Sequence, residues 1–452
     1  MVRSNRIGVF IILACTLAIF PAHAARSSPP AGAAQSQSPD QSASQSAPAQ
    51  PTDVIRGYTL TPEKYQRAKD YSGRKYLHEF IASLFGLVVL LVVLALRLGP
   101  RFRDLAERVS RRRFLQVLIY APLTLLTVAV LSIPTDIWDQ MLAFRFGLSV
   151  QSWASWTTDW ITNQVVMLVV GVVLVWILYA VIRRSPRRWW FYFWLASLPV
   201  LVFVIFLAPM VIEPLFFKFT PLAGQQPALV SEIQKVVQRG GMTIPPERMF
   251  EMNASSKLTG LNAYVSGVGA SKRVVVWDTT IQKATIPQIL FVFGHEMGHY
   301  VLLHIPKELA IDAAVLLALF FLGFHGVQWM LRRWGAAWEI RGQDDLASLP
   351  ALLLMLGILV FFATPIFNTI SRHFEHEADR YGLEVIHGIV SDPNQTAAHY
   401  FQASGEANLA DPDPGPFIEF WFFDHPSRKE RVDFVVNYDP WKAGGEKPVY
   451  VK

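Results

Sequence analysis

The sequence predicts a mostly α-helical protein that crosses a membrane several times and carries one small α+β domain outside it. Of its 452 residues, 52% are hydrophobic and only 17% are charged, which is too apolar for a typical soluble protein. Six apolar runs are long enough, or nearly long enough, to span a bilayer. Between the fourth and the fifth run lies a mixed segment that contains the motif His-Glu-x-x-His.

The N-terminus predicts a signal segment followed by a linker. Residues 1–25 combine two arginines, an apolar stretch and an Ala-His-Ala site, the pattern of a secretory signal peptide; an uncleaved signal anchor is the alternative. Residues 26–54 are almost wholly Ala, Ser, Pro and Gln, so we expect a disordered linker, because they bury too little apolar surface to offset the entropy of ordering. The single cysteine, Cys15, excludes an intrachain disulfide.

The six apolar runs predict a polytopic membrane protein. Any one of them could be a buried core helix, but six together, with aromatic and arginine flanks, indicate membrane spans. A polar helix over residues 61–75 is expected to lead into the first. We predict an N-terminal transmembrane region over residues 55–212 with four spans, and a domain over residues 213–452 that contains two more. The runs are residues 80–96, 114–133, 165–182, 189–212, 313–331 and 349–370.

The loops between the runs predict the orientation. Arginines concentrate in three loops and are nearly absent from residues 134–164, and the positive-inside rule places arginine-rich loops in the cytoplasm. Residues 213–311 and the tail after residue 371 then lie on the outer side. We expect an integral protein of a bacterial inner membrane with its active site on the periplasmic side. Because the arginines cluster between apolar runs, the net charge of +6 does not predict a nucleic-acid partner. The three loops are residues 97–113, 183–188 and 332–348.

The segment between the fourth and fifth runs predicts the small α+β domain. Residues 227–239 have apolar side chains at helical spacing. Residues 249–252, 262–268 and 273–278 are typical of short strands, and the last two are expected to form a hairpin. A helix then carries the histidine motif, and Pro306 is expected to kink or end it before the fifth span.

The motif predicts a zinc site. His295 and His299 are four residues apart, so on a helix both imidazoles lie on one face and can reach one metal ion. Zinc binds neutral imidazole nitrogens in tetrahedral sites and, in enzymes, keeps one position for water. Glu296 follows the first histidine and can take a proton from that water. We expect one Zn²⁺ per chain and Glu296 as the catalytic base.

The spacing of residues after the motif leaves the remaining ligand open. Glycine and histidine at the next ligand positions would indicate a third histidine, but Leu302 and Ile305 occupy those positions. His304 misses the spacing by one residue and is expected to be an interface histidine without a role in the site. A later helix offers Glu375 and Asp379 on one face, of which one could bind zinc and the other orient a ligating histidine. Spacing alone does not exclude His376 or Glu377 as the ligand.

Several stretches of the sequence resemble the integral-membrane zinc endopeptidases of the CAAX prenyl protease 1 type and, more distantly, the bacterial heat-shock membrane zinc proteases. The resemblance covers residues 58–431, and its specific motifs come after residue 212. These motifs are IEPLFFKFTPL at 212–222, Asn-Ala-Tyr at 262–264 followed by KRVVVWDT, HEMGH at 295–299, SRHFEHEADRYG at 371–382 and, more weakly, His-Pro at 425–426 with Arg431.

The resemblance implies a gluzincin-type zinc protease domain and a role for each matching residue. Glu375 would be the third zinc ligand, beside His295 and His299, and Asp379 the carboxylate that supports the site. Asn262 would lie on an edge strand that pairs with the substrate backbone. His425 and Arg431 would stabilise the oxyanion or hold the peptide. The residues to which the resemblance gives a role are His295, His299, Glu375, Asp379, Asn262, His425 and Arg431.

We therefore expect a membrane-embedded, zinc-dependent endopeptidase that cleaves peptides, membrane proteins or lipidated proteins. CAAX-type processing of prenylated C-termini is the alternative within the class. A membrane scaffold or transporter with a structural zinc site is the alternative from another class, and Asp312, His325 and Gln328 would suit a polar pathway in it. The expected partners are the substrate and the lipid bilayer, with no nucleic acid; the sequence predicts no oligomeric state.

Overall fold

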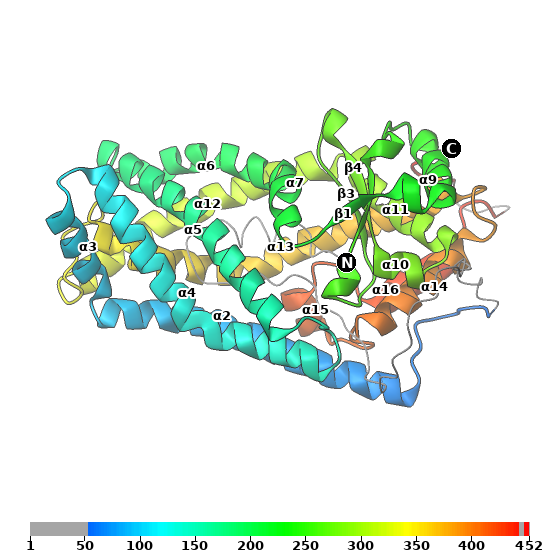
Figure 1. The fold of residues 1–452 in the computed structure, drawn as a ribbon, viewed down its shortest axis with the longest axis horizontal. Helices are drawn as coiled ribbons and strands as arrows, with labels where there is room; N and C mark the ends of the chain where they lie inside the picture. The colour runs from blue at the N-terminus through cyan, green and yellow to red at the C-terminus, as the bar shows by residue number, and fades with distance from the viewer. Residues whose placement is uncertain (1–52, 443–446, 452) are drawn as a thin grey trace.

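The structure, a computed structural model, describes residues 53–442 and 447–451. It is elongated and mostly helical, with a small sheet towards one end (Figure 1). The predicted signal segment and nearly all of the predicted linker lie outside the described residues. The elements are α2 Pro62–Ala95, α3 Leu98–Val109, α4 Arg113–Arg145, α5 Trp153–Arg184, α6 Trp189–Phe206, α7 Ala208–Ile212, β1 Phe219–Pro221, α8 Leu222–Gln225, α9 Pro227–Arg239, β2 Met249–Met252, β3 Ala263–Ser266, β4 Arg273–Trp277, α10 Asp278–Lys283, α11 Ile286–Val301, α12 His304–Trp334, α13 Leu349–Ile386, α14 Pro393–Ala407, α15 Pro416–Phe422 and α16 Arg428–Asn437.

Six helices of the described chain are long and apolar enough to cross a membrane: α2, α4, α5, α6, α12 and α13. The predicted fold class is confirmed, with two differences in the helices. α2 begins at Pro62 and joins the predicted polar helix to the first span; the Thr61 hydroxyl caps it by accepting from the Lys64 amide at 3.4 Å. The fourth apolar run is broken after Phe206, because Pro209 in α7 has no N–H to continue the helix.

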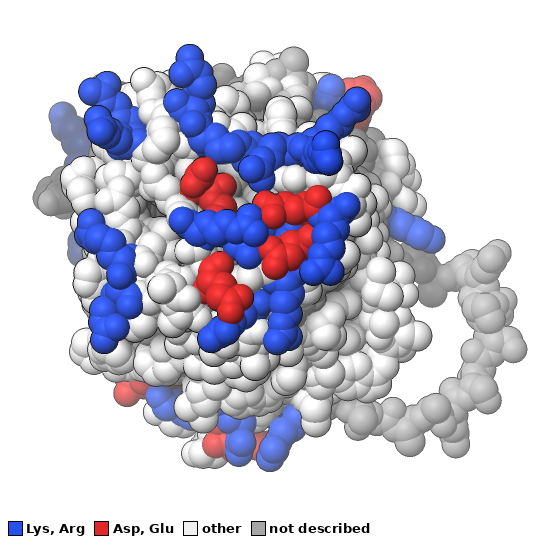
Figure 2. Space-filling model, turned by 90° about the vertical axis from the view of Figure 1, so that its left-hand side faces the viewer, with Lys and Arg blue, Asp and Glu red and all other residues white. Residues whose placement is uncertain are grey.

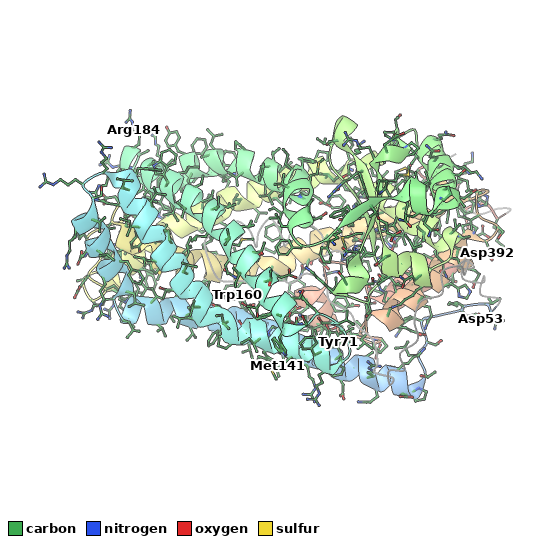
Figure 3. The ribbon with its side chains drawn as sticks, viewed as in Figure 1. Asp53, Tyr71, Met141, Trp160, Arg184 and Asp392 are labelled. Atoms are coloured by element: carbon green, nitrogen blue, oxygen red, sulfur yellow. The ribbon has the colours of Figure 1, made fainter. Side chains whose placement is uncertain are left out.

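The arginine-rich loops meet at the end of the molecule opposite the sheet. Figure 2 shows this end, where exposed arginines surround a few carboxylates. Arg184 lies at this end and Asp392 at the other (Figure 3). The buried Arg103 of α3 donates to Asp345 at 2.6 Å and to the Glu339 carbonyl at 3.0 Å, so it fixes α3 against the loop that precedes α13. The loops at this end are therefore held in place by buried hydrogen bonds.

α13 connects this end to the small domain. Its 38 residues make a helix about 57 Å long, whereas the hydrocarbon core of a bilayer is about 30 Å thick. The helix starts in the apolar core of the bundle, and its last turns pack with α11 and α14 in a second core. The side chains after its apolar run are consequently carried beyond the span and into the small domain (Figure 1).

A four-stranded mixed sheet, in the order β1-β2-β4-β3, forms the β part of the small domain. β4 pairs antiparallel with β3, which confirms the predicted hairpin, and parallel with β2. β1, which pairs antiparallel with β2, was not predicted. β3 is an edge strand of the sheet, and α11 packs beside it. α11 ends at Val301, five residues before Pro306, so the proline is not what ends it.

Candidate metal centre

α11 and α13 approach each other closely because glycines lie where they meet. A Cβ atom at Gly294 would lie 2.7 Å from Val385 Cγ1, and one at Gly382 would lie 3.0 Å from the His295 backbone nitrogen. Larger residues at these positions would push the two helices apart. The close contact brings the imidazoles of α11 within reach of a carboxylate on α13. The sequence shows these glycines inside both motifs, but their packing role was not predicted.

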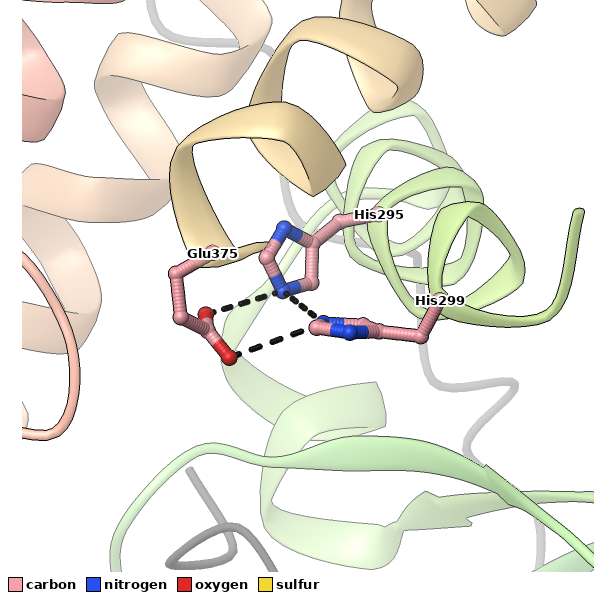
Figure 4. A group of neighbouring side chains, drawn as sticks. All are labelled: His295, His299 and Glu375. Atoms are coloured by element: carbon pink, nitrogen blue, oxygen red, sulfur yellow. Dashed lines mark hydrogen bonds and ion pairs between the residues drawn. The ribbon is translucent and has the colours of Figure 1, made fainter. Parts of the chain in front are cut away.

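His295, His299 and Glu375 point their polar atoms towards one another (Figure 4). His295 Nε2 lies 3.4 Å from His299 Nε2 and 3.3 Å from Glu375 Oε2, and His299 Nε2 lies 3.5 Å from Glu375 Oε1. Ligand atoms around a tetrahedral zinc ion, with bonds of about 2.0–2.1 Å, lie roughly 3.3 Å apart. The three side chains therefore have the spacing of a zinc-binding group with three protein ligands.

The chemistry of the three side chains also fits a divalent cation. Glu375 is buried, and its Oε2 has no hydrogen-bond partner in the part of the chain that the structure describes. Burial lowers the pKa of His299 to about 3, so this imidazole is neutral, as a ligand must be. Burial also opposes a charge on His295, but the neighbouring Asp379 and Glu375 carboxylates outweigh burial and raise its pKa to about 9. A cation bound at Nε2 would take the place of the proton that faces Glu375, while the Nδ1–H would stay with Asp379.

Asp379 orients His295. The Nδ1 atom of His295 lies 2.9 Å from Asp379 Oδ1, which leaves Nε2 facing Glu375. Arg431 of α16 donates from Nε to Asp379 Oδ2 at 2.8 Å and from Nη2 to Oδ1, and both side chains are buried. Arg431 thus balances the charge of the carboxylate that holds the imidazole. Its predicted contact with substrate stays a prediction.

Glu296 lies on α11 between the two histidines and is half-buried. Burial, aided by the nearby Glu375 carboxylate, raises its pKa to about 7 despite the opposing effect of His295. A carboxylate with a pKa near neutrality can both take and return a proton at physiological pH. These properties are the ones expected of a general base beside a metal-activated water.

His425 reaches the same site from the loop between α15 and α16. Its Nε2 lies 3.2 Å from Glu375 Oε1, and its Nδ1 lies 2.8 Å from Asp424 Oδ1. Burial lowers the affinity of His425 for a proton, but Glu375 and Asp424 outweigh it and raise the pKa of His425 to about 9. A proton donor is therefore held beside the candidate ligands. Asp424, which holds this imidazole, was not singled out in the sequence.

Asn262 directly precedes the edge strand β3. Its N–H donates to Thr280 Oγ1 at 2.7 Å, and its carbonyl accepts from the Trp277 N–H at 3.1 Å. The side chain is buried, and its Nδ2 has no hydrogen-bond partner among the described residues. The backbone of Asn262 is thus fixed by Trp277 of β4 and by the Thr280 side chain of α10, whereas the nitrogen of its side-chain amide is not engaged. Among the described residues, Asn262 makes no hydrogen bond to His295, His299 or Glu375.

His304, which was expected to be an interface histidine without a role in the site, lies against the candidate ligand His299. Its side chain is fully buried, and its Nδ1 lies 3.2 Å from Nδ1 of His299. Helical spacing did not reveal the contact, because α11 stops at Val301 and the chain turns at Leu303 in the left-handed region (φ 57°) before α12 begins.

Comparisons of the sequence with protein families give two matches. The family described as "Peptidase family M48" matches residues 223–439, and the one described as "CAAX prenyl protease N-terminal, five membrane helices" matches residues 42–218. Both matches begin after the predicted signal segment and give it no support.

Named relatives and a solved structure are similar over most of the chain. The uncharacterized metalloprotease YhfN of Bacillus subtilis (strain 168) is 32% identical over 84% of this chain and 88% of its own length. The CAAX prenyl protease 1 homolog of Dictyostelium discoideum is 24% identical over 72% of this chain and 77% of its own. The crystal structure of S. mikatae Ste24p has a TM-score of 0.70 and 21% identity, over 84% of this chain and 89% of that one, and so shares the fold.

Proposed function

The chain belongs to peptidase family M48, as a membrane metalloprotease, and we propose that it is a zinc-dependent endopeptidase that cleaves peptides, membrane proteins or lipidated proteins. The observation that carries this proposal is the triangle of His295, His299 and Glu375 with Glu296 beside it. Three protein ligands leave the fourth tetrahedral position for water or substrate, as catalytic zinc sites require.

Each proposed step uses a residue of the site. Bound zinc would be held by His295, His299 and Glu375, polarise the scissile carbonyl and acidify the attacking water. Glu296 accepts the proton of that water and returns it to the leaving amine. His425 donates to the carbonyl oxygen as negative charge develops on it, a contribution typically worth about 3 kcal/mol. Asp379 keeps the His295 imidazole in the tautomer that presents Nε2.

The edge strand β3 supports the proposal that the enzyme is an endopeptidase and not an exopeptidase, which recognises a peptide terminus. An extended peptide can add to a strand edge through its backbone, so that neither of its termini needs to be recognised. We assign the edge of β3 to this pairing, the side-chain amide of Asn262 to a hydrogen bond with the bound peptide, and Arg431 to the support of Asp379. The unengaged Asn262 amide supports the assignment.

The arginine-rich end supports an orientation with the site on the outer side of a bacterial inner membrane, by the positive-inside rule. An alkaline phosphatase fused after residue 452 should then be active, because that enzyme folds only outside the cytoplasm. The same reporter fused after Arg188, at the arginine-rich end, should be inactive. The reverse pattern would contradict this orientation.

CAAX-type processing of prenylated tails is the second candidate function, because several relatives carry that name. It requires a substrate on the same side as the site. The fusion experiment therefore also separates the two candidates: an inactive reporter after residue 452, with an active one after Arg188, would favour CAAX-type processing.

Removal of zinc tests the proposed function itself. The purified protein in detergent should cleave an internally quenched peptide, lose cleavage to the uncatalysed background after treatment with a zinc chelator, and regain it with one equivalent of Zn²⁺ per chain. A scaffold or transporter with a structural zinc site would show no cleavage before treatment. Cleavage that persists in verified zinc-free protein would overturn the metal mechanism.

A further inference from the structure

A chain of polar contacts extends from the candidate ligand His299 away from the metal site. His299 Nδ1 lies 3.2 Å from His304 Nδ1, and His304 Nε2 lies 3.1 Å from Glu377 Oε2. The second carboxylate oxygen, Glu377 Oε1, accepts from the Tyr450 hydroxyl at 3.2 Å. The four side chains come from α11, α12, α13 and the C-terminal tail. None of these contacts involves the Asp379–Arg431 pair that orients the other histidine.

The hydrogens along this chain can be assigned in one consistent direction. His299 Nε2 faces Glu375, so a neutral His299 that binds a cation there carries its hydrogen on Nδ1. That N–H donates to His304 Nδ1, which must then be the unprotonated nitrogen of a neutral imidazole. The hydrogen of His304 is consequently on Nε2 and donates to Glu377. Every donor has one acceptor, and no contact opposes another.

The backbone is arranged to bring His304 into this position. Leu303 has a positive φ of 57°, which a residue with a side chain rarely adopts, and α12 begins immediately after it. The turn places His304, five residues after His299, back against that imidazole. Its ring is fully buried and packs on Phe374 with ring centroids 4.7 Å apart. The turn at Leu303 and the burial of the ring thus both hold His304 against His299.

Glu377 is in turn held by the tail of the chain. Glu384, two turns further along α13, accepts from the backbone amides of Val449, Tyr450 and Val451 at 2.8, 2.6 and 2.8 Å. These bonds fix the tail along α13 and so direct the Tyr450 hydroxyl at Glu377. Glu377, the carboxylate at the end of the contacts from His299 through His304, is therefore held by the C-terminal tail and not by a residue of the metal site.

We propose that His304, supported by Glu377, is a positioning residue that fixes the tautomer and ring orientation of His299 for metal binding. The inference rests on the proposed function, because it assigns a ligand role to His299. Metal-ligating histidines usually donate their second N–H directly to a carboxylate or a carbonyl. Here a second imidazole stands between ligand and carboxylate, so the two histidines of the motif are oriented by different means: His295 by Asp379 and His299 by His304.

Two substitutions of His304 test the proposal, because one keeps the shape of the ring and removes the hydrogen-bond acceptor, and the other keeps the acceptor and removes the ring. His304→Phe keeps a flat ring against Phe374 but removes the acceptor for His299. His304→Asn loses the ring but places Oδ1 where Nδ1 was. The dissociation constant for zinc, measured by competition with a chromophoric chelator, should rise about 10- to 100-fold in His304→Phe. His304→Asn should stay closer to wild type, and kcat should fall with zinc affinity while KM changes little.

Glu377→Ala gives an independent measurement. It should weaken zinc binding in the wild-type background but have no further effect in His304→Phe, because there Glu377 is already disconnected from His299. His325→Phe, the same change further along α12, serves as the matched control and should bind zinc as wild type does. Wild-type zinc affinity in Glu377→Ala would overturn the proposal even if His304→Phe failed to accumulate.

The reverse order of the two His304 variants would also overturn it. If His304 only fills space, His304→Phe will bind zinc normally and His304→Asn will be the weaker. A wild-type protein that binds no zinc would instead refute the proposed function, so the two failures are distinguishable.

Discussion

Replacing Glu296 by glutamine is expected to lower kcat by about 10²–10⁴-fold while the protein keeps its zinc. Glutamine has nearly the same size and shape as glutamate but cannot accept a proton from the attacking water. Glu296 is not one of the three residues that form the candidate zinc-binding group, so its loss should leave metal affinity unchanged. The measurements are kcat on a quenched peptide and zinc content per chain, on the same purified sample.

The control for this variant is Glu232→Gln on α9, a change of the same kind in a partly exposed carboxylate that pairs with Lys235 on the surface. It should match wild type in both measurements. A zinc-loaded Glu296→Gln protein with wild-type kcat would show that another group takes the proton. Loss of zinc from the variant would show that Glu296 contributes to the site itself.

Replacing Arg431 by methionine is expected to destabilise the protein by about 3–5 kcal/mol, because it leaves the Asp379 carboxylate buried without its cation. Both side chains are buried, and Arg431 meets Asp379 through two hydrogen bonds. The freed carboxylate should also hold His295 less firmly, so zinc affinity should fall about 10- to 100-fold. Denaturant titration in detergent measures the first effect and chelator competition the second.

Arg341→Met is the matched control, because Arg341 lies in the arginine-rich loop between α12 and α13, where its exposed guanidinium pairs with Glu107 at 2.9 Å. Exposed pairs of this kind contribute at most about 1 kcal/mol. Equal losses of stability in the two variants would mean that the Asp379–Arg431 pair has no special role. A destabilised Arg431 variant with unchanged zinc affinity would show that Arg431 stabilises the fold but does not support His295.

Local periodicity was enough to predict the parts of the site that lie on one helix. His295 and His299 are related by helical spacing alone, and that spacing holds in α11. The six spans and the strands over residues 249–252 and 273–277 also follow from runs of apolar residues that are visible without tertiary context. The hairpin of β3 and β4 follows because the two strands are adjacent in sequence.

Features that depend on packing between distant elements could not be predicted in this way. Spacing alone left Glu375, His376, Glu377 and Asp379 open as ligands, and the choice depends on the face of α13 that glycines bring against α11. β1 was missed because three residues ending in Pro221 have no detectable strand period. The contact of His304 with His299 depends on a left-handed turn at Leu303. No local rule assigns that conformation to a leucine.

A crystal structure of the zinc-loaded protein, with anomalous diffraction measured at the zinc absorption edge, tests the central claim most directly. The account predicts one peak per chain, within about 2.0–2.2 Å of His295 Nε2, His299 Nε2 and a Glu375 oxygen, with water as the fourth ligand. A peak elsewhere, or a fourth ligand from the protein at this position, would contradict it.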